Sequence, residues 1–168
     1  MFTRERKKTN LSGVETNMSK EIKFYRANEV PYGLFSNFDT KHPITVDGVK
    51  WPSTEHYFQA MKFKGTGHVE AVRKAPKPRD AADMGRDRSR PLRKDWEDVK
   101  DAVMLEAVRA KFTQHEDCKT LLIGTGDAML IEHTTNDNYW ADGGDGSGKN
   151  VLGRILMQVR AEINMEII

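Results

Sequence analysis

Cysteine is nearly absent from this chain of 168 residues, which contains one, Cys118. A single cysteine excludes a disulfide within the chain and any metal site built from several cysteine ligands. It also favours the cytoplasm, where thiols stay reduced, as the location of the protein. Long apolar runs are missing too: none approaches the roughly 18 residues of a membrane helix, and none follows the charged start of the chain as in a secretory signal. We therefore expect no membrane partner.

The motifs of several common hydrolases are also missing. The five histidines show no metal-ligand spacing, and no G-x-S-x-G nucleophile elbow occurs. Residues 143–150 fit most of a phosphate-binding loop, but Asn150 stands where that loop needs Ser or Thr, and polar residues precede it instead of a buried strand. The sequence thus predicts no metal, no cofactor, no nucleoside triphosphatase, and no serine or cysteine triad.

Charge is close to balanced over most of the chain. Residues 1–20 carry five basic and two acidic residues, which leaves 22 basic and 23 acidic residues, a net charge of −1, in the remainder. A nearly neutral domain does not favour nucleic-acid binding. Residues 1–19 lack apolar periodicity, so we predict a flexible extension there and a single domain over residues 20–168.

Apolar periodicity predicts an α+β fold that is predominantly helical and has a small antiparallel sheet. Strands are expected at 22–25 and 129–132, with a hairpin over 44–51 around Asp47-Gly48. The helices are expected at 53–64 with Ser53 as N-cap, 67–75, 78–85, 96–115 with Asp95 as cap, 117–124 and 150–164. Two apolar stripes mark helix 96–115 as the central one.

The expected helix 53–64 brings three functional groups to one face. Glu55, Gln59 and Lys62 are spaced i, i+4 and i+7, within about 60° on a helical wheel. A solvated surface stripe is the structural alternative. Four nearby aromatic residues argue against it, since they are too many for an exposed helix: Trp51, Tyr57, Phe58 and Phe63. Glu55 lies in the first turn, where the helix dipole favours the ionised carboxylate.

Two further segments have the composition of substrate-binding regions. The loop over 137–150 is rich in glycine and acidic residues, and its Tyr139-Trp140 pair could stack on a flat ring. The stretch 73–94 holds nine basic and three acidic residues, and arginines suit phosphate geometry. The structural alternatives are a flexible surface loop and charge balance against the acidic residues of 95–98.

Several segments occur in the order typical of one known family. They are FSNF at 35–38, WPSTEHYFQAMKF at 51–63, GRDR at 85–88, DW at 95–96, KF at 111–112 and the loop 137–153. With these segments the chain resembles the NADAR/YbiA-like family over about residues 22–163. The resemblance implies an N-glycosidase that hydrolyses the bond between ribose C1′ and an exocyclic amine. The implied substrates are ribosylaminopyrimidine 5′-phosphates of riboflavin biosynthesis, ADP-ribosylated guanine, or both, with ADP-ribosylated DNA as a partner in the second case.

The resemblance also implies roles for individual residues. Lys62 would exchange with the departing amine and form a Schiff base at C1′, for which desolvation must lower its pKa. Glu55 would be the general acid/base, and Asp137 would stabilise the cationic ribosyl centre. Lys149 is the alternative Schiff-base lysine, and direct attack by water between two carboxylates stays open. The implied substrate-binding residues are Asn37, Trp51, Gln59, Arg86, Arg88, Trp96, Trp140, Asp142, Asp145, Lys149 and Asn150.

Two other functional classes compete with the enzyme. A non-catalytic ADP-ribose-binding module would use the same stacking and phosphate contacts but leave the glycosidic bond intact. A nucleic-acid-binding module would show an affinity that falls steeply with salt. The nearly neutral domain argues against the latter.

Overall fold

The computed structural model describes residues 19–166, so the predicted extension over 1–19 lies outside the described residues apart from Ser19. The elements follow in this order: β1 (Glu21–Phe24), a 3-10 helix (Tyr32–Phe35), β2 (Ile44–Val46), β3 (Val49–Trp51), α1 (Thr54–Met61), α2 (His68–Arg73), α3 (Pro78–Arg86), α4 (Trp96–Gln114), α5 (Glu116–Gly124), β4 (Met129–Glu132) and α6 (Val151–Glu166). This order confirms the predominantly helical α+β class. Among the helices over 19–166, none combines the length and the apolar character that a membrane crossing requires.

The strands form two separate pairs. β2 and β3 make the predicted antiparallel hairpin, in which Asp47 and Gly48 adopt positive φ of 50° and 77° as a tight turn requires. β1 pairs with β4 in parallel, with Ile22 opposite Leu130. Residues 25–128 make up the crossover that a parallel pair needs. Periodicity predicts both strands but not this partnership, because their pairing depends on contacts far apart in the chain.

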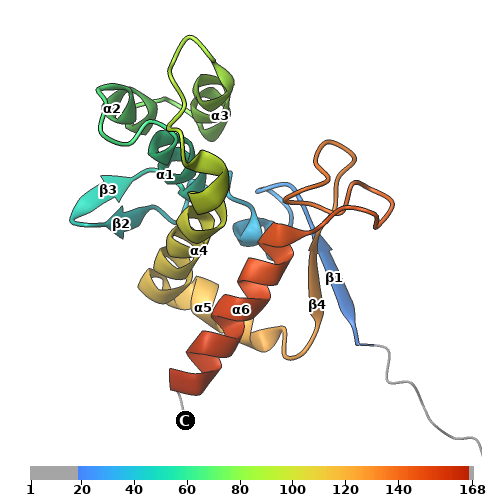
Figure 1. Ribbon diagram of the computed structural model, residues 1–168. Helices are drawn as coiled ribbons and strands as arrows, with labels where there is room; N and C mark the ends of the chain where they lie inside the picture. Colours follow the sequence, from blue (N-terminus) through green and yellow to red (C-terminus); the bar gives the residue numbers. More distant parts are fainter. Residues whose placement is uncertain (1–18, 167–168) are drawn as a thin grey trace, which may run out of the picture.

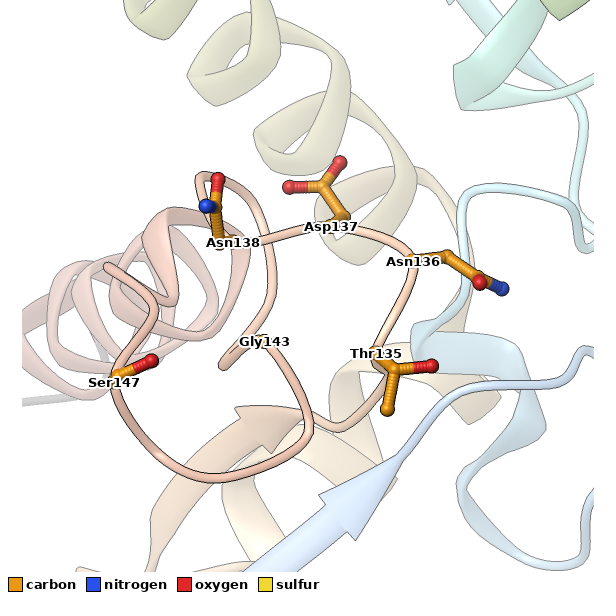
Figure 2. Close-up of a pocket in the computed structure, with 6 residues that line it drawn as sticks. All are labelled: Thr135, Asn136, Asp137, Asn138, Gly143 and Ser147. Atoms are coloured by element: carbon orange, nitrogen blue, oxygen red, sulfur yellow. The ribbon is translucent and has the colours of Figure 1, made fainter.

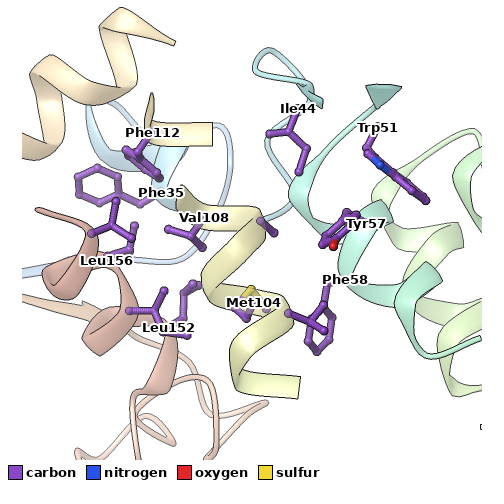
Figure 3. Close-up of a cluster of buried hydrophobic side chains, with 14 of the residues drawn as sticks. Phe35, Ile44, Trp51, Tyr57, Phe58, Met104, Val108, Phe112, Leu152 and Leu156 are labelled. Atoms are coloured by element: carbon purple, nitrogen blue, oxygen red, sulfur yellow. The ribbon is translucent and has the colours of Figure 1, made fainter. Parts of the chain in front are cut away.

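Helix α4 is central, as its two apolar stripes predict. It lies between α1 on one side and α5 and α6 on the other (Figure 1). Figure 3 shows Leu152 and Leu156 of α6 on one side of α4, and Tyr57 and Phe58 of α1 on the opposite side. Each such buried side chain contributes about 1.5–3 kcal/mol through the hydrophobic effect. The core therefore joins α1 to the C-terminal half of the chain through α4.

Ser53 is the predicted N-cap of α1, and its Oγ accepts a hydrogen bond from the His56 N–H at 3.2 Å. Two other helix termini differ from the sequence prediction. Helix α1 ends at Met61 rather than near Lys64, with Lys62 as C-cap. Asp95 occupies the N-cap position of α4 but does not cap it with its side chain. Its carboxylate instead accepts from the guanidinium of Arg93, at 2.6 and 2.8 Å.

A buried ion pair joins α4 to the segment before β2. Lys111 is 1% exposed, and its Nζ lies 3.1 Å from Asp39 Oδ2 and donates to Ser36 O at 3.1 Å. His42 lies between two carboxylates, with 2.5 Å to Asp39 and 2.7 Å to Asp117. Since a charge in the interior needs a partner, this network depends on each of its members.

We expect Asp39→Asn to lower the free energy of unfolding by about 3–5 kcal/mol, because it leaves the Lys111 ammonium buried without a carboxylate. Urea denaturation measures this change. Asp98→Asn, at an exposed position of α4, is the matched control and should cost less than about 1 kcal/mol. Equal losses in the two variants would contradict the buried-pair interpretation.

Candidate active site

Helix α1 carries Glu55 and Gln59 inside the protein, since all its residues from Thr54 to Ala60 are buried. The start of the helix is tied to the segment after the 3-10 helix. Asn37 O accepts from the Glu55 N–H at 3.2 Å, and Asn37 Oδ1 accepts from Thr54 Oγ1 at 2.9 Å. The structure thus places Asn37 beside Glu55. The aromatic residues around this segment correctly indicate that the stripe is not a solvated surface.

Glu55 is 8% exposed, and its carboxyl accepts a 2.7 Å hydrogen bond from Gln59 Nε2. Burial raises its pKa, and the hydrogen bond from Gln59 and the charges of Lys62 and Arg86 only partly oppose this. The expectation that the helix dipole favours the ionised form of Glu55 is therefore wrong, because desolvation outweighs the dipole and the net shift of the pKa is upward. A carboxyl with a raised pKa can donate a proton near neutral pH.

Lys62 extends from the end of α1 into an aromatic enclosure. Its Nζ lies 5.7 Å from the ring centre of Phe58, 5.8 Å from that of Trp96, and 3.5 Å from Gly85 O, to which it donates. Burial lowers the pKa of Lys62 to about 8; Glu55 opposes this shift, whereas Arg88 and Arg86 add to it. The prediction of a lysine desolvated among aromatic side chains is confirmed. At pH 7 about a tenth of such an amine is neutral and nucleophilic.

The loop 134–149 brings Trp140 and Asp137 to α1. The Trp140 and Trp96 rings both contact Phe58 edge-on, with centroids 5.2 and 5.1 Å away. Asp137 Oδ1 accepts from the N–H groups of Tyr139 and Trp140, each at 2.8 Å, and the charge of Asp137 raises the pKa of Glu55. Asp137 also lines an open pocket of about 480 Å³ within this loop (Figure 2).

Two arginines at the end of α3 complete the group around Lys62. The Arg88 guanidinium donates to Gly85 O, the same oxygen that Lys62 contacts. Arg86 is largely exposed and lies 3.1 Å from Asp83 Oδ1. The charge of Arg86 contributes to the lowered pKa of Lys62, and an exposed guanidinium at this place is suited to hold a phosphate group. The structure thus brings together Glu55, Gln59, Lys62, Arg86, Arg88, Trp96, Asp137 and Trp140.

Other residues expected to bind substrate have partners within the fold. Trp51 is buried, and its ring packs edge-on against that of Tyr57, with ring centroids 5.2 Å apart. Because Tyr57 lies two residues beyond Glu55, it is on nearly the opposite face of α1. Asp142 accepts from the Thr134 and Gly144 N–H groups at 3.2 and 2.8 Å. Its other oxygen lies 2.7 Å from His133 Nδ1. These contacts assign Trp51 to the core and Asp142 to the shape of the loop.

The end of the loop is likewise built by its own side chains. Asn150, at φ 50°, donates to Leu130 O at 2.9 Å and accepts from the Glu132 N–H at 3.0 Å. Asp145 is exposed and accepts from Ser147. Lys149 is exposed, with Nζ 5.3 Å from the centre of the Tyr139 ring. The structure does not place these three residues in the enclosure around Lys62.

Glu132, at the end of β4, is an acid that the sequence analysis leaves without a role. Its carboxyl makes no hydrogen bond or ion pair within residues 19–166. Burial, together with the charges of Asp137, Glu55 and Asp142, raises its pKa to about 8. One sequence signal could have found it, since residues 120–148 contain five acids and no Lys or Arg. Acids gathered without cations are pushed toward their neutral forms.

We expect Glu132→Gln to make the fold more stable at alkaline pH. A carboxyl whose folded pKa is raised binds protons more strongly in the folded state, so the stability of the wild type falls as pH rises from about 4.5 to 8. The free energy of unfolding of the variant, relative to that of the wild type, should rise by about 2–4 kcal/mol from pH 5 to pH 8. Urea denaturation measures this difference. Glu116→Gln, at an exposed position, should show no such gain. The same difference at both pH values would contradict the raised pKa.

Within residues 19–166, one group of side chains could hold a metal ion. His42, Asp117 and Cys118 present donor atoms that all lie within 4.8 Å of one another. However, both nitrogens of His42 already contact carboxylates, and burial raises the pKa of the Cys118 thiol to about 12. Since the thiolate is the form that binds metals, we assign this group to the buried network around Lys111. The absence of a metal stays a prediction.

Comparison with known proteins identifies the family. The NADAR domain matches residues 23–164. The N-glycosidase YbiA of Escherichia coli (strain K12) is 53% identical over 145 residues, which cover 86% of this chain and 89% of YbiA. A riboflavin biosynthesis protein of Vibrio vulnificus is 43% identical over 87% of this chain but only 39% of its own length. The NMR structure of E. coli YbiA superposes with a TM-score of 0.81, at 52% identity, over 88% of this chain and 87% of that one.

These similarities extend over most of the chain and include both its sequence and its fold. The chain shares the class of its curated relatives, the N-glycosidases, which are hydrolases of N-glycosyl bonds. The order of segments from FSNF at 35–38 to the loop 137–153 correctly predicts this kinship. The chain belongs to the NADAR domain family.

Proposed function

We propose that this N-glycosidase cleaves the bond between ribose C1′ and an exocyclic amine in a ribosylaminopyrimidine 5′-phosphate. The observation that carries the proposal is the pairing on α1 of Lys62, whose pKa burial lowers to about 8, with Glu55, whose pKa burial raises. The riboflavin biosynthesis name of the Vibrio vulnificus relative favours this substrate. ADP-ribosylated guanine has the same kind of N-linked ribose with a pyrophosphate, and is the second substrate to test.

In the proposed reaction Glu55 protonates the ring oxygen, and the ribosylamine opens to an iminium at C1′. The neutral amine of Lys62 adds to this carbon; Glu55 takes a proton from the added nitrogen and gives it to the exocyclic amine, which leaves. A protonated Schiff base between Lys62 and the sugar results. Water, deprotonated by Glu55, adds to C1′. The proton of the new hydroxyl passes to the Lys62 nitrogen, the Lys62–C1′ bond breaks, and open-chain ribose 5-phosphate is released. Each turnover returns both side chains to their starting protonation states.

The surrounding side chains suit the remaining tasks. Trp96, Trp140 and Phe58 offer ring faces and edges for the pyrimidine and the sugar. Arg86, which is largely exposed, and Arg88 are proposed to hold the 5′-phosphate. The Asp137 carboxylate, fixed by two backbone N–H groups, is proposed to stabilise the cationic C1′.

The enclosure favours Lys62 over its two alternatives. Lys149 is exposed and lies beside the Tyr139 ring, whereas the Lys62 amine lies near both Phe58 and Trp96. Direct attack by water would use Glu55 with Asp137 or Glu132, and would leave no role for Lys62. A cytoplasmic location stays a prediction from the scarcity of cysteine.

A mass-spectrometric assay with two substrates tests the proposed function. The purified chain is incubated with ribosylaminopyrimidine 5′-phosphate or with DNA carrying ADP-ribosylated guanine, and the products are identified. We expect ribose 5-phosphate from the first substrate. Release of ADP-ribose alone would move the substrate assignment to modified guanine. Binding of ADP-ribose without turnover of either substrate would contradict the proposal and favour the non-catalytic binding module.

A further inference from the structure

Gly85 of α3 lies against the Gln59 side chain of α1. A Cβ at this position would lie 1.8 Å from Gln59 Oε1 and 2.7 Å from Gln59 Cδ. Contacts this short do not occur between unbonded atoms, so any other residue at position 85 must displace the Gln59 amide. The backbone does not itself demand glycine here, because Gly85 is absent from the residues with positive φ. The close approach to Gln59 is therefore the reason for a glycine inside a helix, where it is otherwise unfavourable.

The amide that Gly85 admits is the group that holds Glu55. Gln59 is 6% exposed, and its Nε2 donates to Glu55 Oε1 at 2.7 Å. Its Oε1 is buried and has no hydrogen-bond partner within the described part of the chain. A single hydrogen bond and the steric fit over Gly85 therefore set the orientation of this amide.

Gly85 also contacts the other side of the site through its backbone. Its carbonyl oxygen accepts from Lys62 Nζ at 3.5 Å and from the Arg88 guanidinium. One residue of α3 thus lies between the side chain that fixes Glu55 and the amine of Lys62. Because these contacts are to Gln59, Lys62 and Arg88, we expect Gly85 to influence the reaction through those side chains.

We propose that Gly85 is a positioning residue, whose missing side chain seats the Gln59 amide against Glu55 and whose carbonyl oxygen orients Lys62. The inference rests on the proposed roles of Glu55 and Lys62. It predicts that a single methyl group on α3 impairs the reaction through Gln59, although alanine favours helix formation more than glycine does.

A double-mutant cycle tests this inference. We expect Gly85→Ala to lower kcat by about tenfold or more, as small displacements of catalytic groups do. Gly124→Ala is the control, since nothing lies within 4 Å of a Cβ there, and should stay within about twofold. Gln59→Ala removes the contacts with Oε1 and Cδ together with the hydrogen bond, and leaves only the 3.3 Å approach to the Gln59 Cβ. In that background Gly85→Ala should therefore cause little further loss of kcat.

The pH profile separates positioning from simple loss of folded protein. The hydrogen bond from Gln59 lowers the pKa of Glu55, so its loss should move the Glu55 limb of the kcat/KM profile to higher pH. We expect the same movement in Gly85→Ala, in Gln59→Ala and in the double variant. The double variant lacks the two shortest contacts and so provides the test even if Gly85→Ala folds poorly. A lower folded fraction would reduce activity without moving the limb.

The outcomes distinguish this inference from the proposed function. If Glu55→Gln is impaired, two results would overturn the positioning role of Gly85. One is an unchanged kcat and pH profile in Gly85→Ala. The other is an equal loss of kcat from Gly85→Ala in the wild-type and Gln59→Ala backgrounds. Full activity of Glu55→Gln would instead overturn the proposed role of Glu55, on which the inference rests.

Discussion

Glu55→Gln should lower kcat by about 10²–10⁴-fold, the range that a positioned general acid or base contributes. Glutamine keeps the shape of the side chain and its 2.7 Å contact with Gln59 but has no proton to transfer to the leaving amine. The wild-type rate should fall as pH rises through the raised pKa of Glu55, because the carboxyl then loses the proton it must donate. The variant should lack this limb. Steady-state kinetics between pH 5 and pH 10 measure both effects.

Thermal unfolding provides the control for this variant. Burial raises the pKa of Glu55, so its ionised form is unfavourable inside the fold, and a neutral amide should cost little stability. We therefore expect Glu55→Gln to unfold at or above the wild-type temperature at pH 8. A folded variant with kcat within about tenfold of the wild type would assign the proton transfer to another group, such as Glu132.

Lys62→Ala should lower kcat by at least about 10³-fold, as expected when a covalent nucleophile is removed. Lys62→Arg tests the covalent step more specifically, because it keeps a cation near Phe58 and Trp96 but forms no Schiff base. In the wild type, kcat/KM should rise by up to about tenfold per pH unit below pH 8, since the pKa of Lys62 near 8 governs the neutral fraction of this amine in the free enzyme. Combined with the Glu55 limb, this rise gives a bell-shaped profile.

Lys149→Ala is the matched control for the lysine variants. It should keep kcat within a few-fold of the wild type, because Lys149 is exposed and lies beside Tyr139. If Lys149→Ala were the inactive variant, the Schiff base would belong to the loop instead of α1. Full activity in both Lys62→Arg and Lys149→Ala would favour direct attack by water.

Local patterns in the sequence predict helix α1, which carries the proposed catalytic residues, well. The i, i+4, i+7 spacing places Glu55, Gln59 and Lys62 on one stripe, and the structure joins the first two by a hydrogen bond. The aromatic content of the segment correctly indicates burial and, with it, the lowered pKa of Lys62. These features depend on neighbours in the chain and on helical periodicity, which a sequence shows directly.

Features that depend on distant contacts could not be predicted in the same way. The partnership of β1 with β4 and the approach of Gly85 to Gln59 exist only after the helices have packed. Polar residues of the glycine-rich loop resemble ligand-binding groups in sequence, yet Asp142 and Asn150 bond to the backbone of their own loop and of β4. The direction in which the pKa of Glu55 shifts likewise depends on burial, which outweighs the effect of the local helix dipole.

Trapping the covalent intermediate tests the central claim most directly. The wild type, Lys62→Arg and Lys149→Ala are each mixed with ribosylaminopyrimidine 5′-phosphate in the presence of borohydride, which reduces a Schiff base to a stable amine. Peptide mass spectrometry then locates the adduct. We predict a ribose 5-phosphate adduct on Lys62 in the wild type and in Lys149→Ala, and none in Lys62→Arg. Turnover of the substrate without any adduct on Lys62 would contradict the account.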